Sequence, residues 1–149
     1  MEWEDWSPKR VAAATDGSEL SIHAARVAAS LARLHDAKLF VITVVRPPEG
    51  WWGIGGAPPP PDVLGDALTE AQRSVLELTT RALNVEGLNF QTVEELGDPA
   101  SRLVAFCKEN QIDVLVVGRR GAGLVERLVM GSVADRVTHE SPCPVLVVP

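Results

Sequence analysis

The stretch Lys38-Leu39-Phe40-Val41-Ile42-Thr43-Val44-Val45 is apolar at odd and even positions alike. A strand with this pattern has apolar side chains on both faces, which is typical of parallel sheets covered by helices on each side. Residues 112–117 have the same character, and shorter apolar runs lie at 11–14 and 144–148. Residues 88–96 alternate poorly but include β-forming residues, so they predict a fifth strand.

Apolar residues at helical spacing separate these strands. They run through 20–34, 64–82 and 100–107, and a short helix is expected after Ser132. Strands and helices that alternate, joined by right-handed crossovers, form a doubly wound α/β fold. The sequence therefore predicts a single α/β domain whose five-stranded parallel sheet has the order 3-2-1-4-5, with helices on both faces.

Three helix starts carry recognisable residues. Asp62 is predicted to be the N-cap of the second helix, and Asp98-Pro99 combines a cap with a proline at the first helical position. Ser132 and Asp135 have the spacing of a capping box, which predicts Ser132 as the cap of the fourth helix.

Length and composition are those of one globular domain. The chain has 149 residues, of which 46% are hydrophobic and 23% charged, and its net charge is −6. The negative charge disfavours nucleic acid as a partner. Because no run of about 18 apolar residues occurs and the N-terminus has no signal-peptide pattern, we expect no membrane association and a cytoplasmic location.

The two cysteines are too few for a disulfide framework. Cys107 falls on the apolar stripe of a helix and is predicted to be a core residue. Cys143 precedes the last strand, and nothing nearby in the sequence would make it a thiolate nucleophile. His23, His35 and His139 have no metal-ligand spacing, so no metal site built from protein ligands is expected.

Residues 1–8 are expected to be an N-terminal tail and residues 9–149 the domain. Within the domain, residues 46–61 contain six prolines, four glycines and the pair Trp51-Trp52, which excludes a helix or a central strand. This loop, including Pro58–Pro61, could pack on the domain's own surface or over a crevice. Alternatively it could bind a partner or cover a ligand.

Two strand ends carry polar and glycine-rich segments, Thr15-Asp16-Gly17-Ser18 and the segment 118–123. In open parallel sheets, ligands bind beyond the carboxyl ends of the strands where the strand order reverses. With the order 3-2-1-4-5 these two ends are neighbours, so we expect one crevice that contains both.

The segment from Gly118 to Arg136 has the chemistry of an anion site. Glycines allow backbone N–H groups to approach a ligand, and Gly131-Ser132 opens a helix whose free N–H groups favour phosphate. Four arginines against two acidic residues make it locally cationic in an acidic chain. Neither a P-loop nor the dinucleotide-binding glycine pattern occurs.

Gly118, Gly121, Gly131 and Ser132 have the spacing G-x2-G-x9-G-S. With the Thr15–Ser18 turn, Gly97-Asp98-Pro99 and the final apolar strand, the chain from Lys9 to Pro149 resembles the universal stress proteins. The resemblance implies a site for ATP, with which Mg²⁺ could arrive. It also implies a homodimer formed through the last strand, Val145–Val148.

Carried over by position, the resemblance implies that Asp16 lies at the ribose and adenine end and that the Val44 backbone meets the adenine edge. The residues implied to line the ribose and phosphates are Val117, Gly118, Arg120 and Gly121, and those implied to hold the phosphate tail are Gly131, Ser132 and Val133. Ala14, Thr15 and Ala134 complete the predicted ATP-binding set.

Three functions follow as alternatives. The first is an ATP-binding sensor or regulator in the stress response, without fast turnover, because no lysine or base for phosphoryl transfer is recognisable near the loop. The second is a slow ATPase or phosphate-transferring enzyme that uses Asp16. The third is a protein-interaction module that acts through the Trp/Pro loop.

Overall fold

Strands and helices alternate along the chain, as the apolar pattern predicts. The structure is a computed structural model, and it describes residues 4–46, 61–120 and 130–149. Its elements are, in chain order, β1 Arg10–Ala14, α1 Glu19–His35, β2 Lys38–Val45, α2 Pro61–Ala82, β3 Phe90–Leu96, α3 Pro99–Glu109, β4 Val114–Gly118, α4 Ser132–Glu140 and β5 Val145–Val148.

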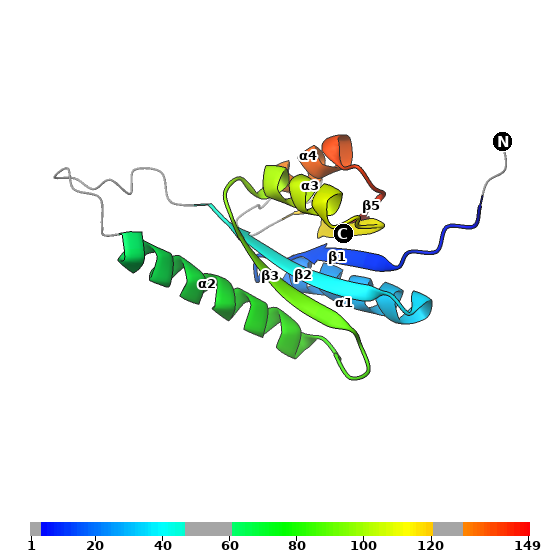
Figure 1. Cartoon of the computed structure of the whole chain (residues 1–149), viewed down its shortest axis with the longest axis horizontal. Helices are drawn as coiled ribbons and strands as arrows, with labels where there is room; N and C mark the ends of the chain where they lie inside the picture. Colours follow the sequence, from blue (N-terminus) through cyan, green and yellow to red (C-terminus); the bar gives the residue numbers. More distant parts are fainter. Residues whose placement is uncertain (1–3, 47–60, 121–129) are drawn as a thin grey trace.

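The five strands form one sheet with the order β3-β2-β1-β4-β5, and every neighbouring pair is parallel (Figure 1). This confirms the predicted order. The middle residues of the three central strands are all buried, namely 11–13 of β1, 39–43 of β2 and 114–117 of β4. The edge strand β3 is largely exposed, which explains why its sequence pattern is weak.

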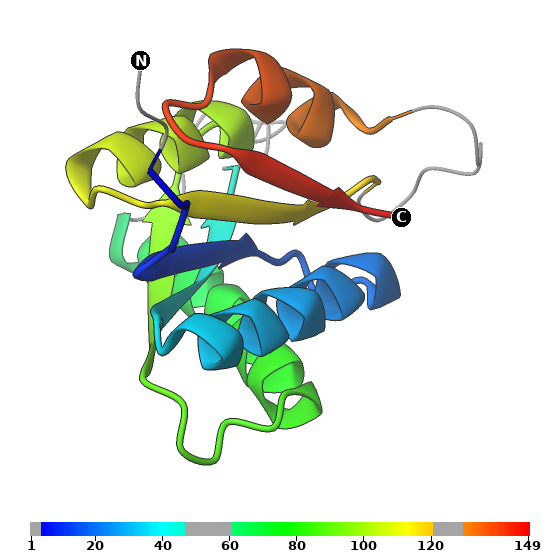
Figure 2. The ribbon, with the colours of Figure 1, turned by 90° about the vertical axis from the view of Figure 1, so that its right-hand side faces the viewer.

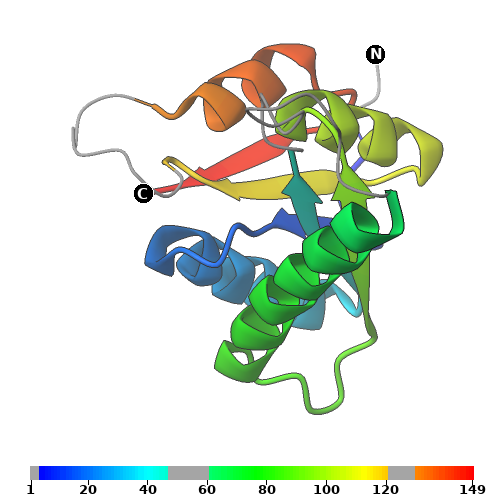
Figure 3. The same ribbon diagram turned by 90° about the vertical axis from the view of Figure 1, so that its left-hand side faces the viewer.

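Helices cover both faces of the sheet. Figures 2 and 3 show α1 and α2 on one side and α3 and α4 on the other. On the first side, five alanines of α1 at 24, 25, 28, 29 and 32 are buried against Val11, Val41 and Val116. On the second side, Phe40 of β2 meets Phe106 of α3 edge to face, with ring centroids 5.6 Å apart.

The structure corrects two of the predicted helix starts. Asp98 caps α3 as predicted, since its side chain accepts a hydrogen bond from the Ser101 N–H at 3.1 Å. However, α2 begins at Pro61, so Asp62 lies inside the helix and not before it. The cap of α4 is Gly131, whose φ of −63° and ψ of 155° are extended, and Ser132 is already the first helical residue. The capping-box prediction is therefore wrong.

Some sequence expectations lie partly or wholly outside the described residues. Residues 4–8 contain no helix or strand, and Trp6 contacts His35 with ring centroids 6.2 Å apart. Trp3, Trp51, Trp52 and the loop interior 47–60 lie outside the described part of the chain, as do residues 121–129. Among the residues that are described, no helix is long and apolar enough to cross a membrane.

Candidate functional site

The turn after β1 is held by its own side chains. The Asp16 Oδ1 atom accepts a hydrogen bond from the Ser18 N–H at 2.9 Å, and Ser18 caps α1 by accepting from the Ser21 N–H at 3.2 Å. Gly17 has a φ of +83°, a conformation that side chains with a Cβ rarely adopt. The sequence Asp-Gly-Ser thus folds the turn so that Thr15 and Asp16 stay at the carboxyl end of β1.

Three buried hydroxyl groups form hydrogen bonds that hold this turn against α1 and α2. Thr15 Oγ1 lies 2.8 Å from Thr79 Oγ1 of α2 and 3.2 Å from Ser21 Oγ of α1. The Gly17 N–H donates to Thr15 Oγ1, and Thr79 donates to the carbonyl oxygen of Val75. All three hydroxyls are buried, with Thr79 fully so, and their contacts join β1, α1 and α2.

The second strand end is made by β4 and the start of α4. A Cβ added to Gly118 would lie 3.2 Å from the carbonyl oxygen of Leu20, so the backbones of α1 and β4 approach closely there. The Gly131 N–H donates to the Arg119 carbonyl at 2.7 Å, which places the start of α4 beside the end of β4. Gly131 has no side chain that could cap α4. The N–H groups in the first turn of a helix have no acceptor within the helix, so they can bind an anion.

One cavity of about 860 Å³ connects these two strand ends. Its apolar wall includes Ile42 and Val44 of β2, Leu103 of α3 and Val117 of β4, and its other side is formed by residues 130–135 at the start of α4. The cavity lies at the reversal of strand order, because β1 and β4 are adjacent in the sheet.

The structure brings together all the predicted site residues that it describes. Those that line the cavity are Ala14, Thr15, Asp16, Val44, Val117, Gly118, Arg120, Gly131, Ser132, Val133 and Ala134. Gly121 lies outside the described residues.

Sequence reasoning missed several lining residues, namely Ser21, Ile42, Pro99, Leu103, Met130 and Asp135. Ile42 could have been found, because it lies two residues before Val44 in a strand and so faces the same side of the sheet. Pro99 and Leu103 carry no local signal, since they reach the cavity only because α3 packs over β2.

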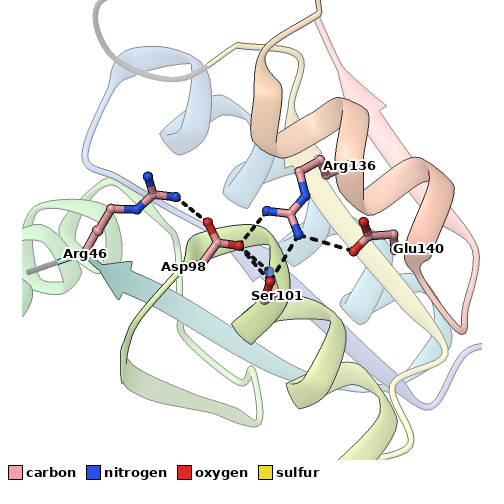
Figure 4. A network of polar contacts seen from close by, with 5 residues as sticks. All are labelled: Arg46, Asp98, Ser101, Arg136 and Glu140. Atoms are coloured by element: carbon pink, nitrogen blue, oxygen red, sulfur yellow. Dashed lines mark hydrogen bonds and ion pairs between the residues drawn. The ribbon is translucent and has the colours of Figure 1, made fainter.

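A network of polar contacts joins α3, α4 and the end of β2 (Figure 4), next to Pro99 and Asp135 of the cavity lining. Asp98 forms ion pairs with Arg46, which follows β2, and with Arg136 of α4, whose Nη1 atom lies 2.6 Å from Asp98 Oδ2. Ser101 donates its hydroxyl to Asp98 Oδ2 at 2.7 Å, and Arg136 also reaches Glu140 at 3.5 Å. These contacts hold the start of α3 against α4.

The hydrogen bonds from Ser101 hold the pKa of Asp98 well below its usual range, and the Arg136 guanidinium adds to this effect. The hydrogen bond to Asp98 in turn raises the pKa of Arg136. Arg136 belongs to the predicted cationic segment, but in the structure its guanidinium forms ion pairs with Asp98 and Glu140. In the described part of the predicted cationic segment, Arg120 is the arginine that lines the cavity.

Metal ligation by side chains has no support in the described residues. Across residues 4–46, 61–120 and 130–149, no group of three or more His, Cys, Asp or Glu side chains could hold a metal ion. His139 lies 3.6 Å from Asp135 as a surface pair one helical turn apart.

Comparison with a protein-family model and with individual proteins gives the same family in both cases. The model of the universal stress protein family matches residues 8–149. Universal stress protein MJ0531 of Methanocaldococcus jannaschii is 32% identical over 147 residues, which cover 94% of this chain and 81% of that protein.

Two solved structures extend the comparison. One, of hypothetical protein MJ0577, superposes with a TM-score of 0.77 at 22% identity over 94% of each chain, which supports the fold. Another is a universal stress protein in complex with cAMP; it superposes with a TM-score of 0.66 at 25% identity and covers 96% of this chain and 98% of its own.

Proposed function

The chain belongs to the universal stress protein family, and from this membership we propose that it is an ATP-binding protein that acts as a nucleotide-linked sensor or regulator in the stress response. In this proposal residues 9–149 are the nucleotide-binding domain and residues 1–8 a tail. The protein works in the cytoplasm, where ATP is available.

The observation that carries the proposal is that one and the same cavity has an apolar wall at one side and a helix N-terminus at the other. Its volume of about 860 Å³ is within the range of small-molecule sites. We propose that the adenine lies against Ile42 and Val44 and that the phosphates face the N–H groups of Ser132 and Val133, where the helix dipole favours negative charge. The complex of a relative with cAMP supports an adenine nucleotide as the ligand.

The residues of the site support ATP binding without fast ATP hydrolysis. The three lysines of the chain, Lys9, Lys38 and Lys108, all belong to the described residues, and none of them lines the cavity. Asp16, the residue proposed for an enzymatic alternative, uses its Oδ1 atom to hold the Ser18 N–H. Its carboxylate therefore has a structural role in the turn.

We also propose that two copies of the chain pair through β5. This strand is at the edge of the sheet, and Leu146 is 39% exposed. The segment Val145–Val148 has no charge or proline that would block its free edge.

A matched pair of variants at Ser132 tests the nucleotide site. Ser132→Pro removes the backbone N–H and the hydroxyl, and Ser132→Ala removes only the hydroxyl. Proline is tolerated at the first helical position, and the φ and ψ of Gly131 suit a residue that precedes proline. Both variants should therefore fold.

Calorimetry with ATP, AMP, cAMP and GTP should show binding of the adenine nucleotides to the wild type. Loss of a hydrogen bond to a charged phosphate should weaken ATP binding about 10-fold to 100-fold in Ser132→Pro, and less in Ser132→Ala. No heat and no thermal shift for the wild type at millimolar ATP would refute the proposal. If Ser132→Pro bound ATP as tightly as the wild type, the phosphates would not contact the first N–H group of α4. Phosphate release measured on the same samples decides between binding alone and hydrolysis.

A further inference from the structure

Thr79 is a fully buried polar residue of α2 that does not line the cavity. Its hydroxyl oxygen lies 2.8 Å from that of Thr15, which follows β1 and does line the cavity. The other side chains that α2 buries in this core are apolar, among them Leu76 and Leu83. A buried hydroxyl costs free energy unless it is hydrogen-bonded, so the partners of Thr79 decide what this position contributes.

The hydrogen bonds around Thr79 run in one direction. A carbonyl oxygen cannot donate, so the single hydroxyl proton of Thr79 goes to the Val75 carbonyl oxygen, 2.9 Å away. The bond between Thr79 and Thr15 is therefore donated by Thr15. The Thr15 oxygen in turn accepts from the Gly17 N–H at 3.2 Å. A chain of donors thus leads from the turn after β1 through two buried hydroxyls to the backbone of α2.

A second chain of donors holds the residue between Thr15 and Gly17. The Asp16 N–H donates to Ser21 Oγ at 3.3 Å, and the Ser21 hydroxyl donates to the Ser18 carbonyl oxygen at 3.0 Å. Ser21 Oγ also lies 3.2 Å from Thr15 Oγ1. Ser21 is therefore an acceptor to which the Thr15 hydroxyl could turn if it lost its bond to α2.

Thr79 lies on the face of the sheet opposite the apolar wall of the cavity. The wall residues Ile42, Val44 and Val117 belong to the core under α3 and α4. Figures 2 and 3 show α2 on the other face of the sheet. Thr79 therefore influences the cavity through the turn after β1, and not by contact with a ligand.

We propose that Thr79 is a positioning residue for the nucleotide: its hydroxyl fixes Thr15 and, through Thr15, the turn that carries Asp16 at the cavity. The inference rests on the proposed function, because nucleotide affinity is the property that Thr79 controls. Without the Thr79 oxygen, the buried Thr15 hydroxyl turns to Ser21 and withdraws its acceptor from the Gly17 N–H. The turn then has more than one arrangement, and a nucleotide has to order it on binding, which lowers the affinity.

Three variants of α2 test this role. Thr79→Val keeps the shape of the side chain and removes the hydroxyl, whereas Thr79→Ser keeps the hydroxyl and removes a methyl group. Gln72→Leu is the matched control, because Gln72 is also buried in α2, and its Nε2 atom donates to the Glu95 carbonyl oxygen of β3 at 2.6 Å. This variant removes a buried polar contact of the same helix that does not involve the turn.

Calorimetry on the full chain should show ATP binding about fivefold weaker in Thr79→Val than in the wild type, the effect of losing one hydrogen bond. Thr79→Ser and Gln72→Leu should both bind ATP within about twofold of the wild type. Urea denaturation of the same samples measures the free energy of unfolding. It separates a loss of stability from an effect on the turn, because ATP affinity should follow the hydroxyl and not the stability.

A double variant tests whether Thr79 acts through Thr15. In a chain that already carries Thr15→Val, the further change Thr79→Val should leave ATP affinity unchanged, because the bond between the two residues is already lost. Independent contributions would multiply instead, and a further fivefold loss in the double variant would contradict the proposed route.

Amide exchange of Gly17, followed by NMR without nucleotide, measures the turn itself. The Gly17 N–H should exchange about fivefold faster in Thr79→Val than in the wild type, since its acceptor is withdrawn. Its exchange rate in Gln72→Leu should equal that of the wild type.

Three results would overturn the proposal: Thr79→Val that binds ATP as tightly as the wild type, Thr79→Ser that loses as much affinity as Thr79→Val, or an equal loss in Gln72→Leu. No ATP binding by the wild type would instead refute the proposed function, and Gly17 exchange would then decide whether Thr79 fixes the turn. If Thr79→Val fails to fold, Thr15→Val removes the same bond from its other end and should show the loss.

Discussion

At the scale of single residues, two glycines hold backbone conformations that other residues resist. Gly17 has a φ of +83° in the turn that carries Thr15 and Asp16, and Gly87 has a φ of +70° in the connection between α2 and β3. A Cβ would meet only ordinary contacts at Gly17 and open space at Gly87. A residue with a Cβ would be strained at both positions. Only Gly17 belongs to the turn whose residues Thr15 and Asp16 line the cavity.

We expect Gly17→Ala and Gly87→Ala each to lower the free energy of unfolding by about 1–2 kcal/mol, the cost of the left-handed conformation for a residue with a Cβ. Urea denaturation measures this. Only Gly17→Ala should also weaken ATP binding in calorimetry, because relaxation of its strain would shift Thr15 and Asp16. Equal ATP affinity in the two variants would show that the turn does not contribute to the site.

At the scale of elements, Asp98 connects α3, α4 and the end of β2. It caps α3 through Ser101 and pairs with Arg46 and Arg136. Its pKa is lowered in the folded protein. An aspartate of this kind contributes stability that is present above its unfolded pKa, about 4, and is lost as the pH falls through the lower folded pKa.

We expect Asp98→Asn to lower the Tm at pH 7, because asparagine keeps a cap acceptor but loses both ion pairs. The difference in Tm from the wild type should shrink as the pH falls below about 4, where the wild-type contribution is progressively lost. Asp98→Ala should be less stable than Asp98→Asn at every pH, since it also removes the cap. A Tm difference that stays constant down to strongly acidic pH would contradict the role of the charge.

At the scale of the whole molecule, β5 leaves one side of its backbone unpaired within the described chain. The Leu115 and Arg119 N–H groups donate to the carbonyls of Pro144 and Val148, at 3.0 and 2.7 Å. Since peptide groups alternate in direction along a strand, the N–H and C=O of Val145 and Val147 face away from β4. A second copy could pair there.

We expect a dimer mass for the wild type in native mass spectrometry and a monomer for Val147→Pro, which removes an outward N–H and leaves the ladder to β4 intact. Val147→Ala keeps the N–H and is the matched control, so it should remain a dimer. Circular dichroism checks that both variants fold. A dimer that persists in folded Val147→Pro would place the interface elsewhere.

The sequence by itself determined the α/β class, the strand order and most of the cavity wall described here. Apolar runs on both faces identify central parallel strands. Asp16 and Gly118 mark the ends of β1 and β4, and Gly131 marks the start of α4. These are local signals, because the period of the side chains and the conformation of a turn depend on neighbouring residues.

Only the tertiary structure decided which distant residues meet. Leu103 lines the cavity and Arg136 forms an ion pair with Asp98 because α3 and α4 pack on the same face of the sheet. The N-cap of α4 is likewise Gly131, which has an extended backbone and donates a hydrogen bond to the Arg119 carbonyl. Contacts of this kind arise from the packing of whole elements against each other, so no pattern along the chain encodes them.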